Sequence, residues 1–379
     1  RLMASLSLPH DMKPLIWIDA HQDIAYNALT FGRDIRFSAY ETRRREAGTP
    51  TVQVNGEALC GWEEYQRGYI GVIVATLFVM PRRYKSGAWE KLDFATFEEA
   101  YRLTRAQMDY YFDLCDQSPD QFCLIRNRGE LQDHQQRWHA APPQFPQHSQ
   151  PVGLVLSMEG AEGVRDRREL EAWWEEGLRL IGPVWAGTRF CGGMYEGDGF
   201  TDEGFRLLGE MAEIGYTLDI AHMTEKSALQ ALDRYEGAVI CSHSNAAALL
   251  KDEAAVRRHL SDRVIRRLAE RDGVIGVVPF NRFLRSGWKN HEPREWVTLQ
   301  HLADHVDHIC QLTGSVRHVA IGTDFDGGFG YPAVPLEMDT IADLPKLAGV
   351  LVERGFSEQD LRAVAETNWL RILEQTLPA

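Results

Sequence analysis

Short apolar runs recur along the chain, and amphipathic segments separate them. Nine runs have the length and β-branched content of strands; they cover residues 15–21, 69–80, 121–127, 152–160, 178–185, 216–222, 237–243, 274–280 and 318–324. Strands that alternate with helices over a whole chain predict a parallel sheet wrapped by helices. We therefore expect an α/β protein, a (β/α)8 TIM-like barrel with peripheral insertions. Residues 121–127 would then form a ninth strand in addition to the eight of the barrel.

Two of the intervening segments carry clear helix start and stop signals. Residues 202–214 follow Thr201, a favourable N-cap residue, and precede Gly215. The segment after Ser261 repeats the arrangement, and Gly273 is its predicted stop. Hydroxyl side chains cap free amide groups at a helix start, and glycine adopts the left-handed conformation that ends many helices. Both segments are therefore predicted to be surface helices of the barrel.

The alternation of strands and helices is interrupted by residues 134–151, which are rich in proline and glutamine. Because the alternation resumes directly afterwards, this segment predicts an insertion loop rather than a linker. The glycine-rich segment 190–200 is expected near the mouth of the barrel, where it could shape specificity. No repeat or boundary divides the chain, so residues 1–379 are expected to form one barrel domain.

Composition limits which binding partners and which cellular compartment are expected. The chain has 41 Lys and Arg against 55 Asp and Glu, a formal net charge of −14, whereas nucleic-acid binding depends on basic residues. The longest apolar run, starting at Tyr69, is too short to span a bilayer, and the amino terminus lacks a secretory signal pattern. The six cysteines lack CxxC spacing and are expected to be reduced. We expect a cytoplasmic protein without nucleic-acid or membrane partners.

Residues able to bind a metal end five of the predicted strands. They are His21 and Asp23, Glu159, His222, His243 and Asp324. The carboxyl ends of strands in a parallel barrel meet on one face, where such folds carry their active sites. A single His or Asp at a strand end often only caps the next helix, but six together indicate a shared site. Imidazoles and carboxylates are ligands suited to zinc and similar metals.

The spacing of these residues predicts how they would divide between two ions. Side chains alternate along a strand, so His21 and Asp23 would project to the same side and bind one ion. Glu159 has two carboxylate oxygens and could bridge two ions. His222 and His243 would then bind the second ion.

Two other groupings resemble functional motifs and are set aside. His301, His305 and His308 have helical spacings of four and three, but they lie among aspartates without the glutamate of an HExxH motif, which predicts a solvated helix face. Cys241 and His243 could suggest a nucleophile and its base. Residues two apart on a strand are not ordinarily such a pair, and Ser242 has no GxSxG turn around it.

Several segments, taken together, resemble the renal or membrane dipeptidase family of metallopeptidases. "DAHQD" is similar to that family's DGHND, "SMEGAEG" to its VEGGH-type segment and "DIAHMT" to DLSHVS. "CSHSNA" is similar to FSHSSA, "IGTDFDG" to GGDFDG and "ETNWLRIL" to the closing GxNxLRV. Six such segments in the family's order carry the resemblance through most of the chain.

The resemblance implies a zinc-dependent dipeptidase with two zinc ions per chain. One ion would be bound by His21, Asp23 and Glu159, and the other by Glu159, His222 and His243. A hydroxide bridging the ions would attack the peptide bond of a small dipeptide, with a D-residue tolerated at its C-terminal position as in some relatives. Asp324 would take the proton and pass it to the leaving amine.

The family also contacts substrate through residues that this chain matches or replaces. "RRHLSD" resembles an RNLSD-like run, which makes Arg258 the residue expected to clamp the substrate carboxylate, with Arg257 as the alternative. Trp185 stands where the family commonly has a histidine that contacts the substrate carbonyl. A metal alone, or a donor such as Arg189, would then replace that contact. Phe280, near a position where relatives can carry tyrosine, predicts a more apolar substrate pocket.

Two other functions remain open from the sequence. A related amidohydrolase could cleave N-acyl amino acids, lactones or β-lactams at the same metal pair, because the strand-end histidine is replaced by Trp185. A barrel that has lost its chemistry could act as a binding protein, although all expected ligands and Asp324 are present. Small dipeptides are the expected partners, and a homodimer is the assembly expected if the chain associates with itself.

Overall fold

The structure, a computed structural model, describes residues 13–289 and 292–379. Eight parallel strands follow one another around a barrel: β1 (Trp17–Gln22), β2 (Ile70–Phe78), β6 (Val152–Glu159), β7 (Leu178–Gly182), β8 (Thr217–Asp219), β9 (Val239–Ile240), β10 (Ile275–Val277) and β11 (Val319–Ile321). A bridge between Cys241 and Ile275 joins the β1–β9 sheet to the β10–β11 pair. The amide of Asp324 donates to the carbonyl of His21 at 3.2 Å and links β11 to β1. The predicted (β/α)8 fold class is confirmed.

A further parallel strand, β5 (Phe122–Leu124), lies beside the start of β6. Phe122 is opposite Val152 in this pair, whereas β7 pairs with β6 only from Leu156 onward. Since β2 occupies the other edge of β6, β5 and β7 share one edge and β5 is additional to the eight. The prediction that 121–127 holds the extra strand is confirmed.

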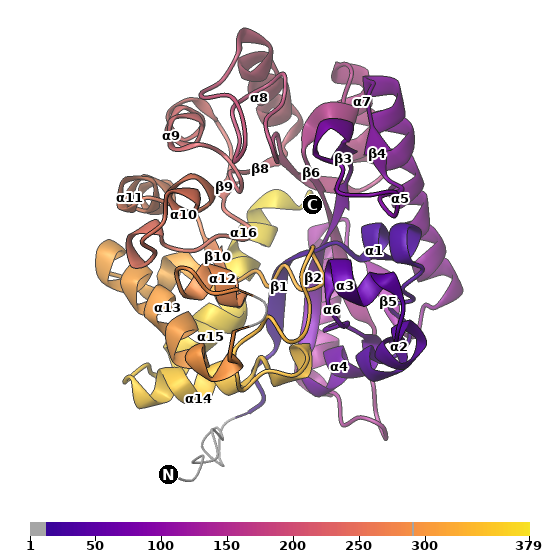
Figure 1. Cartoon of the computed structure of the whole chain (residues 1–379), viewed down its shortest axis with the longest axis vertical. Helices are drawn as coiled ribbons and strands as arrows, with labels where there is room; N and C mark the ends of the chain where they lie inside the picture. Colours follow the sequence, from indigo (N-terminus) through magenta and orange to yellow (C-terminus); the bar gives the residue numbers. More distant parts are fainter. Residues whose placement is uncertain (1–12, 290–291) are drawn as a thin grey trace.

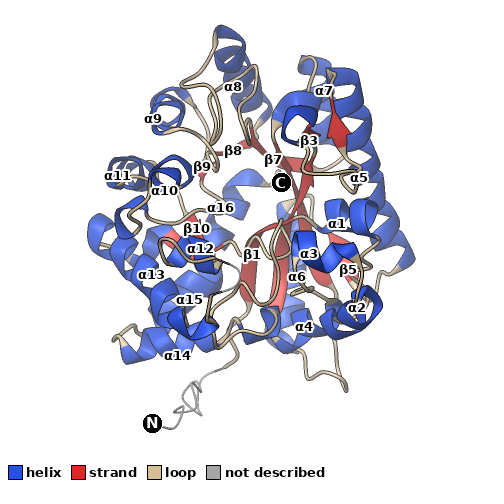
Figure 2. Ribbon diagram, in the orientation of Figure 1, coloured by secondary structure: helices blue, strands red, loops and turns tan. Residues whose placement is uncertain are grey.

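Most helices lie around the outside of the strands, while the last one packs against the apolar interior of the barrel (Figures 1 and 2). The helices are α1 (Ile24–Phe31), α2 (Ala39–Glu46), α3 (Pro50–Asn55), α4 (Trp62–Arg67), α5 (Phe97–Gln117), α6 (Arg128–Ala140), α7 (Arg167–Glu175), α8 (Asp202–Ile214), α9 (Glu225–Arg234), α10 (Glu253–Arg258), α11 (Asp262–Glu270), α12 (Asn281–Leu284), α13 (Leu299–Thr313), α14 (Lys346–Glu353), α15 (Glu358–Arg362) and α16 (Asn368–Thr376). Two short strands, β3 (Met80–Pro81) and β4 (Asp93–Phe94), pair beside α5 and hold the loop between them.

The two helices predicted from their end signals are present as α8 and α11. Thr201 accepts a hydrogen bond from the amide of Gly204, and Gly215 ends α8 with φ of 112°. Ser261 accepts from the amide of Val264 at the start of α11. The predicted stop at Gly273 is wrong, because α11 ends at Glu270.

Residue 272 rather than 273 takes the left-handed conformation after α11, with φ of 54° at Asp272. Gly273 is required for a different reason. A Cβ atom there would lie 2.4 Å from Leu268 Cδ1 and 2.6 Å from the Val239 carbonyl oxygen. This glycine therefore allows the close packing of α11 against β9.

The prediction of a loop over 134–151 is wrong for its first half, because α6 continues to Ala140. Asn127 caps this helix through the amide of Glu130. Three side chains spaced along one face of α6 are buried, namely Leu131, His134 and Trp138. This burial holds the segment as a helix despite its polar composition, and only the residues after 140 form the loop.

Alternate strand residues fill the barrel interior, because successive strand side chains point to opposite faces. Ile18 and Ala20 of β1 pack with Val72 and Val74 of β2 and with Trp369 of α16. Further along β2, Phe78 lies directly opposite Glu159 of β6. The apolar interior therefore gives way to polar chemistry at the carboxyl ends of the strands.

In the part of the chain that the structure describes, no helix combines the length and apolar character needed to cross a membrane.

Candidate active site and metal centre

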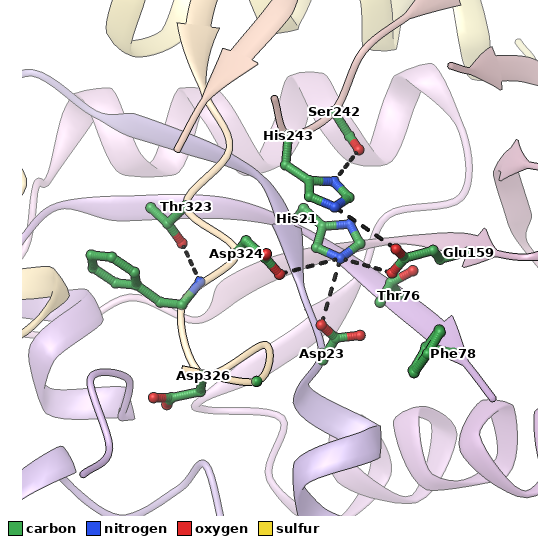
Figure 3. A network of polar contacts seen from close by, with 12 residues as sticks. His21, Asp23, Thr76, Phe78, Glu159, Ser242, His243, Thr323, Asp324 and Asp326 are labelled. Atoms are coloured by element: carbon green, nitrogen blue, oxygen red, sulfur yellow. Dashed lines mark hydrogen bonds and ion pairs between the residues drawn. The ribbon is translucent and has the colours of Figure 1, made fainter. Parts of the chain in front are cut away.

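The six strand-end residues predicted as ligands or proton carrier converge on one point at the carboxyl ends of the strands. His21 lies in β1 and Asp23 is the N-cap of α1, while Glu159 ends β6. The other three residues, His222, His243 and Asp324, follow β8, β9 and β11. Figure 3 shows His21 at the centre, with Asp23, Glu159 and Asp324 around it and His243 beside it.

Glu159 joins the histidines of this cluster. Its Oε2 lies 3.2 Å from His21 Nε2, and its Oε1 lies 2.5 Å from His222 Nε2 and 3.8 Å from His243 Nε2. The Nε2 atoms of His222 and His243 are 2.8 Å apart. The two oxygens of one carboxylate thus face imidazole nitrogens from three strands, which is the arrangement expected of a bridging ligand.

A second group forms on the other side of His21. The Nε2 atom of His21 lies 3.6 Å from Asp23 Oδ2 and 3.8 Å from Asp324 Oδ1. Neither His21 Nε2 nor Asp23 Oδ1 has a hydrogen-bond partner, although both atoms are buried. Buried polar atoms are normally satisfied, so these two indicate that a bound species completes the site.

His21 faces the site because β1 is irregular. The pairing of β1 with β2 shifts between Asp19 and Gln22, where three steps along β1 match two along β2. Such a bulge turns a side chain that regular alternation would direct elsewhere. Ala20 and His21 therefore both face inward, while Gln22 accepts a hydrogen bond from Tyr65 on the outer side. His21 and Asp23 lie on the same side with Gln22 directed away between them, as their spacing predicts, although Asp23 is the N-cap of α1 rather than a strand residue.

Two buried aspartates that the sequence predictions missed hold the site together. Asp219 accepts hydrogen bonds from the Ser242 amide at 2.9 Å and from its hydroxyl at 2.5 Å. Ser242 Oγ lies 2.7 Å from His243 Nδ1. Because this hydroxyl donates to Asp219, it accepts from Nδ1–H, which leaves the Nε2 lone pair of His243 directed at the site.

Asp19 makes the corresponding connection from β1 to the end of β11. Its carboxylate accepts from the Thr323 amide at 2.7 Å and from the Thr323 hydroxyl at 2.5 Å. Thr323 directly precedes Asp324, as Ser242 precedes His243. In both cases an aspartate on one strand fixes the residue before a functional side chain on a neighbouring strand. The position of an aspartate two or three residues before a strand-end histidine is the signal that could have identified both.

Two residues of this site have unusual backbone conformations. His222 and Asp324 have φ of 66° and 53°, values that residues other than glycine rarely adopt. Gly327 lies so close that a Cβ atom there would be 2.1 Å from Asp324 Oδ1 and 2.9 Å from Asp23 Oδ2. The "DFDGG" turn therefore holds Asp324 in position and leaves space only for glycine at 327.

Burial and mutual charge set the protonation of the metal-free site. Burial lowers the pKa of His222 to about 4 and that of His243 well below its ordinary value. Burial would raise the pKa of Glu159, but His222 and His21 hold it well below its usual range. Burial also raises the pKa of Asp324 well above normal, against the charge of His21. Burial alone would lower the pKa of His21, but Glu159 and Asp23 raise it well above its ordinary value. The site thus presents two neutral imidazoles, His222 and His243, and an ionised bridging carboxylate, while His21 would release its proton on binding a metal.

These residues fit the paired zinc site that the resemblance implies. The ligand atoms of His21, Glu159 and His243 lie within 4.8 Å of one another, as do those of His21, Asp23 and Asp324. The grouping differs from the predicted division, since His243 joins His21 and Glu159. His222 still contacts Glu159 directly. Imidazole nitrogens, carboxylates and unpartnered buried atoms together meet the requirements of a divalent metal centre.

A cavity of about 500 Å³ opens onto the cluster. Asp23, Glu159, His222, His243 and Asp324 line it at one end. Aromatic side chains line the rest, including Tyr26, Phe78, Trp89, Trp185 and Tyr195. A largely apolar cavity with convergent polar groups at one end is the usual form of a small-molecule site.

The residues predicted to contact substrate fall in different places. Trp185 lines the cavity, with its ring centroid 6.4 Å from that of His222. Phe280 stacks on Phe329 at 4.1 Å and does not line the cavity. Arg189 is bound to Glu162 and, at 2.9 Å, to Glu203. Arg189 is therefore not free to replace the missing strand-end histidine.

Arg258 and Arg257 are clearly distinguished. Arg258 is buried, donates to the carbonyl of His243 at 3.2 Å, and keeps its Nη1 without a partner. Arg257 instead donates to the carbonyls of Gly193 and Gly197. Arg258 therefore keeps one unsatisfied guanidinium nitrogen close to His243 but does not line the cavity, whereas Arg257 braces the glycine-rich loop.

The groupings set aside from the sequence have structural roles. Burial raises the pKa of the Cys241 thiol, which opposes a nucleophilic role. The prediction of a solvated face for the α13 histidines is wrong for His305, which is 1% exposed and accepts a hydrogen bond from the Ala246 amide. The side chain packs inward because α13 covers the segment that follows β9.

Comparison with known proteins places the chain in a family. The family model for membrane dipeptidase, peptidase family M19, matches residues 11–378. An uncharacterized Klebsiella pneumoniae protein from the pqqA 5' region is 30% identical over 233 residues, which are 59% of this chain and 82% of that protein. An uncharacterized dipeptidase of Schizosaccharomyces pombe is 32% identical over 178 residues, 47% of this chain but only 40% of the yeast protein.

Solved structures share the fold. A metallopeptidase from Rhodobacter sphaeroides, liganded with a phosphinate mimic of L-Ala-D-Ala, aligns with a TM-score of 0.75 and 22% identity over 96% of this chain and 100% of its own. The M19 dipeptidase AC aligns with a TM-score of 0.75 and 23% identity over 97% of this chain and 100% of its own. The family model extends over nearly the whole sequence. The chain therefore belongs to peptidase family M19, the membrane dipeptidase family of metallopeptidases.

Proposed function

We propose that this chain hydrolyses the peptide bond of small dipeptides at a site that binds two zinc ions. The observation that carries the proposal is the convergence of three imidazole Nε2 atoms on the two oxygens of Glu159. Asp23 and Asp324 complete the cluster at the other side of His21. When bound, a zinc pair would lower the pKa of a water molecule toward neutrality and polarise the scissile carbonyl.

Each residue then has a defined task. His21, Asp23 and Glu159 would hold one ion, and Glu159, His222 and His243 the other. Asp324 would take a proton and deliver it to the leaving amine, a role that suits a carboxylate whose pKa burial raises well above its usual range. The aromatic wall around Trp185 would exclude bulk water from the reacting bond.

Arg258 would select substrates with a nearby free carboxylate. Its unpartnered, buried Nη1 is a donor that a carboxylate would satisfy. This position favours dipeptides over longer peptides, because the C-terminal carboxylate must lie one residue from the scissile bond. A D-residue at that position is included in the proposal, as the Rhodobacter sphaeroides relative is liganded with a mimic of L-Ala-D-Ala.

Metal analysis combined with a substrate panel tests the proposal. The chain would be loaded with zinc and assayed with L-Ala-L-Ala, L-Ala-D-Ala, N-acetyl-alanine, a lactone and a β-lactam. We expect about two zinc ions per chain and hydrolysis of both dipeptides that a chelator abolishes. Cleavage of only the blocked or cyclic compounds would instead establish an amidohydrolase of the alternative type.

A further inference from the structure

The cavity also contains a carboxylate, outside the metal cluster, that the proposed reaction does not use. Glu90 lies on the loop between β3 and β4, lines the cavity and is 1% exposed. The hydroxyl of Tyr26 donates to its Oε1. Its Oε2 is buried and has no hydrogen-bond partner. A buried carboxylate left half satisfied is costly unless a ligand or a proton completes it.

The neighbouring cations of the chain are engaged elsewhere. Arg82 and Lys85, on the same loop, both bind Asp93 at 2.7 Å. Among the described residues, no Arg, Lys or His forms an ion pair with Glu90. Burial, with a contribution from Asp93, raises the pKa of Glu90 to about 7. A positively charged group brought by a ligand would restore the ionised form.

Aromatic rings surround the route to Glu90. Trp89 stacks on Phe31 with centroids 5.5 Å apart, and Tyr84 stacks on Tyr195 at 5.1 Å. All four line the same cavity. Ring faces attract cations, most strongly where water is excluded. A carboxylate at the end of an aromatic passage is therefore suited to an ammonium or guanidinium group on an aliphatic stem.

The position of Glu90 decides which part of a substrate can reach it. Two rings connect Glu90 to the metal cluster: Tyr26, which bonds Glu90, lies 5.5 Å from Phe78 between ring centroids, and Phe78 is opposite Glu159. The α-amino group of a dipeptide is only two bonds from the scissile carbonyl and would remain beside Asp23 and Asp324. A side chain on the amino-terminal residue is long enough to pass these rings.

We infer that Glu90 and the surrounding aromatic rings form a subsite for a cationic side chain, so that the preferred substrates are dipeptides with Arg or Lys as the amino-terminal residue. This inference rests on the proposed dipeptidase function and names its substrate class. The C-terminal carboxylate would lie at Arg258, beside His243. The cationic side chain would lie across the cavity, beside the β3–β4 loop.

The experiment compares isosteric substrates that differ only in charge. Zinc-loaded full-length chain would be assayed with Arg-Ala against citrulline-Ala, and with Lys-Ala against norleucine-Ala. We expect kcat/KM to favour the cationic member of each pair by about tenfold or more. Glu90→Gln should reduce this ratio to within about threefold of unity, because the amide keeps its size but loses its charge.

Two further variants separate a subsite from a structural role. Tyr26→Phe removes the hydrogen bond to Glu90 but keeps the carboxylate, and should retain the preference for cationic substrates. Glu98→Gln, on the exposed side of α5 with a partner in Arg165, should retain the parent ratio. A parent that cleaves both members of each pair equally would overturn the inference. So would a Glu90→Gln variant with an unchanged ratio.

Binding measurements distinguish failure of the inference from failure of the proposed function. If no dipeptide is cleaved, the dipeptidase proposal fails. Calorimetric titration of Arg-Ala and citrulline-Ala would then still test the subsite. Tighter binding of Arg-Ala by the parent, lost in Glu90→Gln, would support it, and equal binding of the two compounds would refute it.

Discussion

Two histidine clusters in this chain have similar composition and different uses. At the strand ends, His21, His222 and His243 direct Nε2 atoms at one shared carboxylate, Glu159. On α13, three histidines point to three separate partners: His301 Nδ1 accepts from the Thr298 amide, His305 Nδ1 accepts from the Ala246 amide, and His308 Nε2 lies 2.8 Å from Asp262. Convergence of lone pairs, rather than the number of histidines, therefore distinguishes a metal site from structural hydrogen bonding.

The sharpest test replaces one histidine in each cluster. His243→Gln should lower dipeptide hydrolysis by about a thousandfold or more and reduce the zinc content, because a ligand nitrogen is lost. His308→Gln on α13 should keep zinc content and activity within about threefold of the parent. Zinc analysis and kcat/KM measurements check both. Equal losses in the two variants would show that the two clusters do not differ in metal binding.

The next test separates proton transfer from metal binding. Asp324→Asn should lower kcat by about a hundredfold to a thousandfold, in the range of a general acid or base, while most of the zinc remains bound. The control is Asp307→Asn on α13, which removes a carboxylate partner of Arg354. This variant should retain kcat. Unchanged kcat in Asp324→Asn would rule out the assigned proton-transfer role.

Substitution of residues that contact the histidines of each cluster should have a smaller effect on zinc binding. Ser242→Ala breaks the connection from Asp219 to His243 Nδ1 and should weaken zinc affinity about tenfold to a hundredfold. Competition with a chromophoric chelator measures this affinity directly. Asp262→Asn removes the corresponding partner of His308. Zinc affinity in that variant should equal that of the parent, and weakening of the same size would contradict the comparison.

The smallest expected effect concerns the pH dependence of folding. Burial lowers the pKa of His305 to about 3, below its ordinary value of 6.5. Between these values the unfolded chain binds the extra proton, so His305 makes the fold less stable as the pH falls below about 6.5. His305→Asn keeps an acceptor for the Ala246 amide and removes this titration.

Chemical denaturation at pH 7 and pH 5 measures the difference. On going from the higher to the lower pH, the parent should lose roughly 2 kcal/mol more free energy of unfolding than His305→Asn. The zinc content of the variant should not change, in contrast to the strand-end histidines. An identical pH dependence in the parent and variant would mean that His305 is not held in its neutral form.

Local patterns account for much of what the sequence predicted well. The positions of the strands, the caps at Thr201 and Ser261, and the placement of six reactive residues at strand ends all follow from periodicity and nearest-neighbour preferences. The predictions that failed depended on distant contacts. His305 looked solvated among aspartates, and α6 looked like a loop, because neither sequence segment reveals the surface against which it packs.

The sequence by itself determined a parallel barrel and the residue types that gather at its carboxyl face, because strand period and chain order act locally and all strands end on the same side. Only the tertiary structure decided that a bulge turns His21 inward, that Asp219 orients His243 through Ser242, and that Glu90 meets Tyr26 across 64 residues of chain. These features depend on which elements pack together, and packing is the sum of many weak, long-range contacts that no single segment encodes.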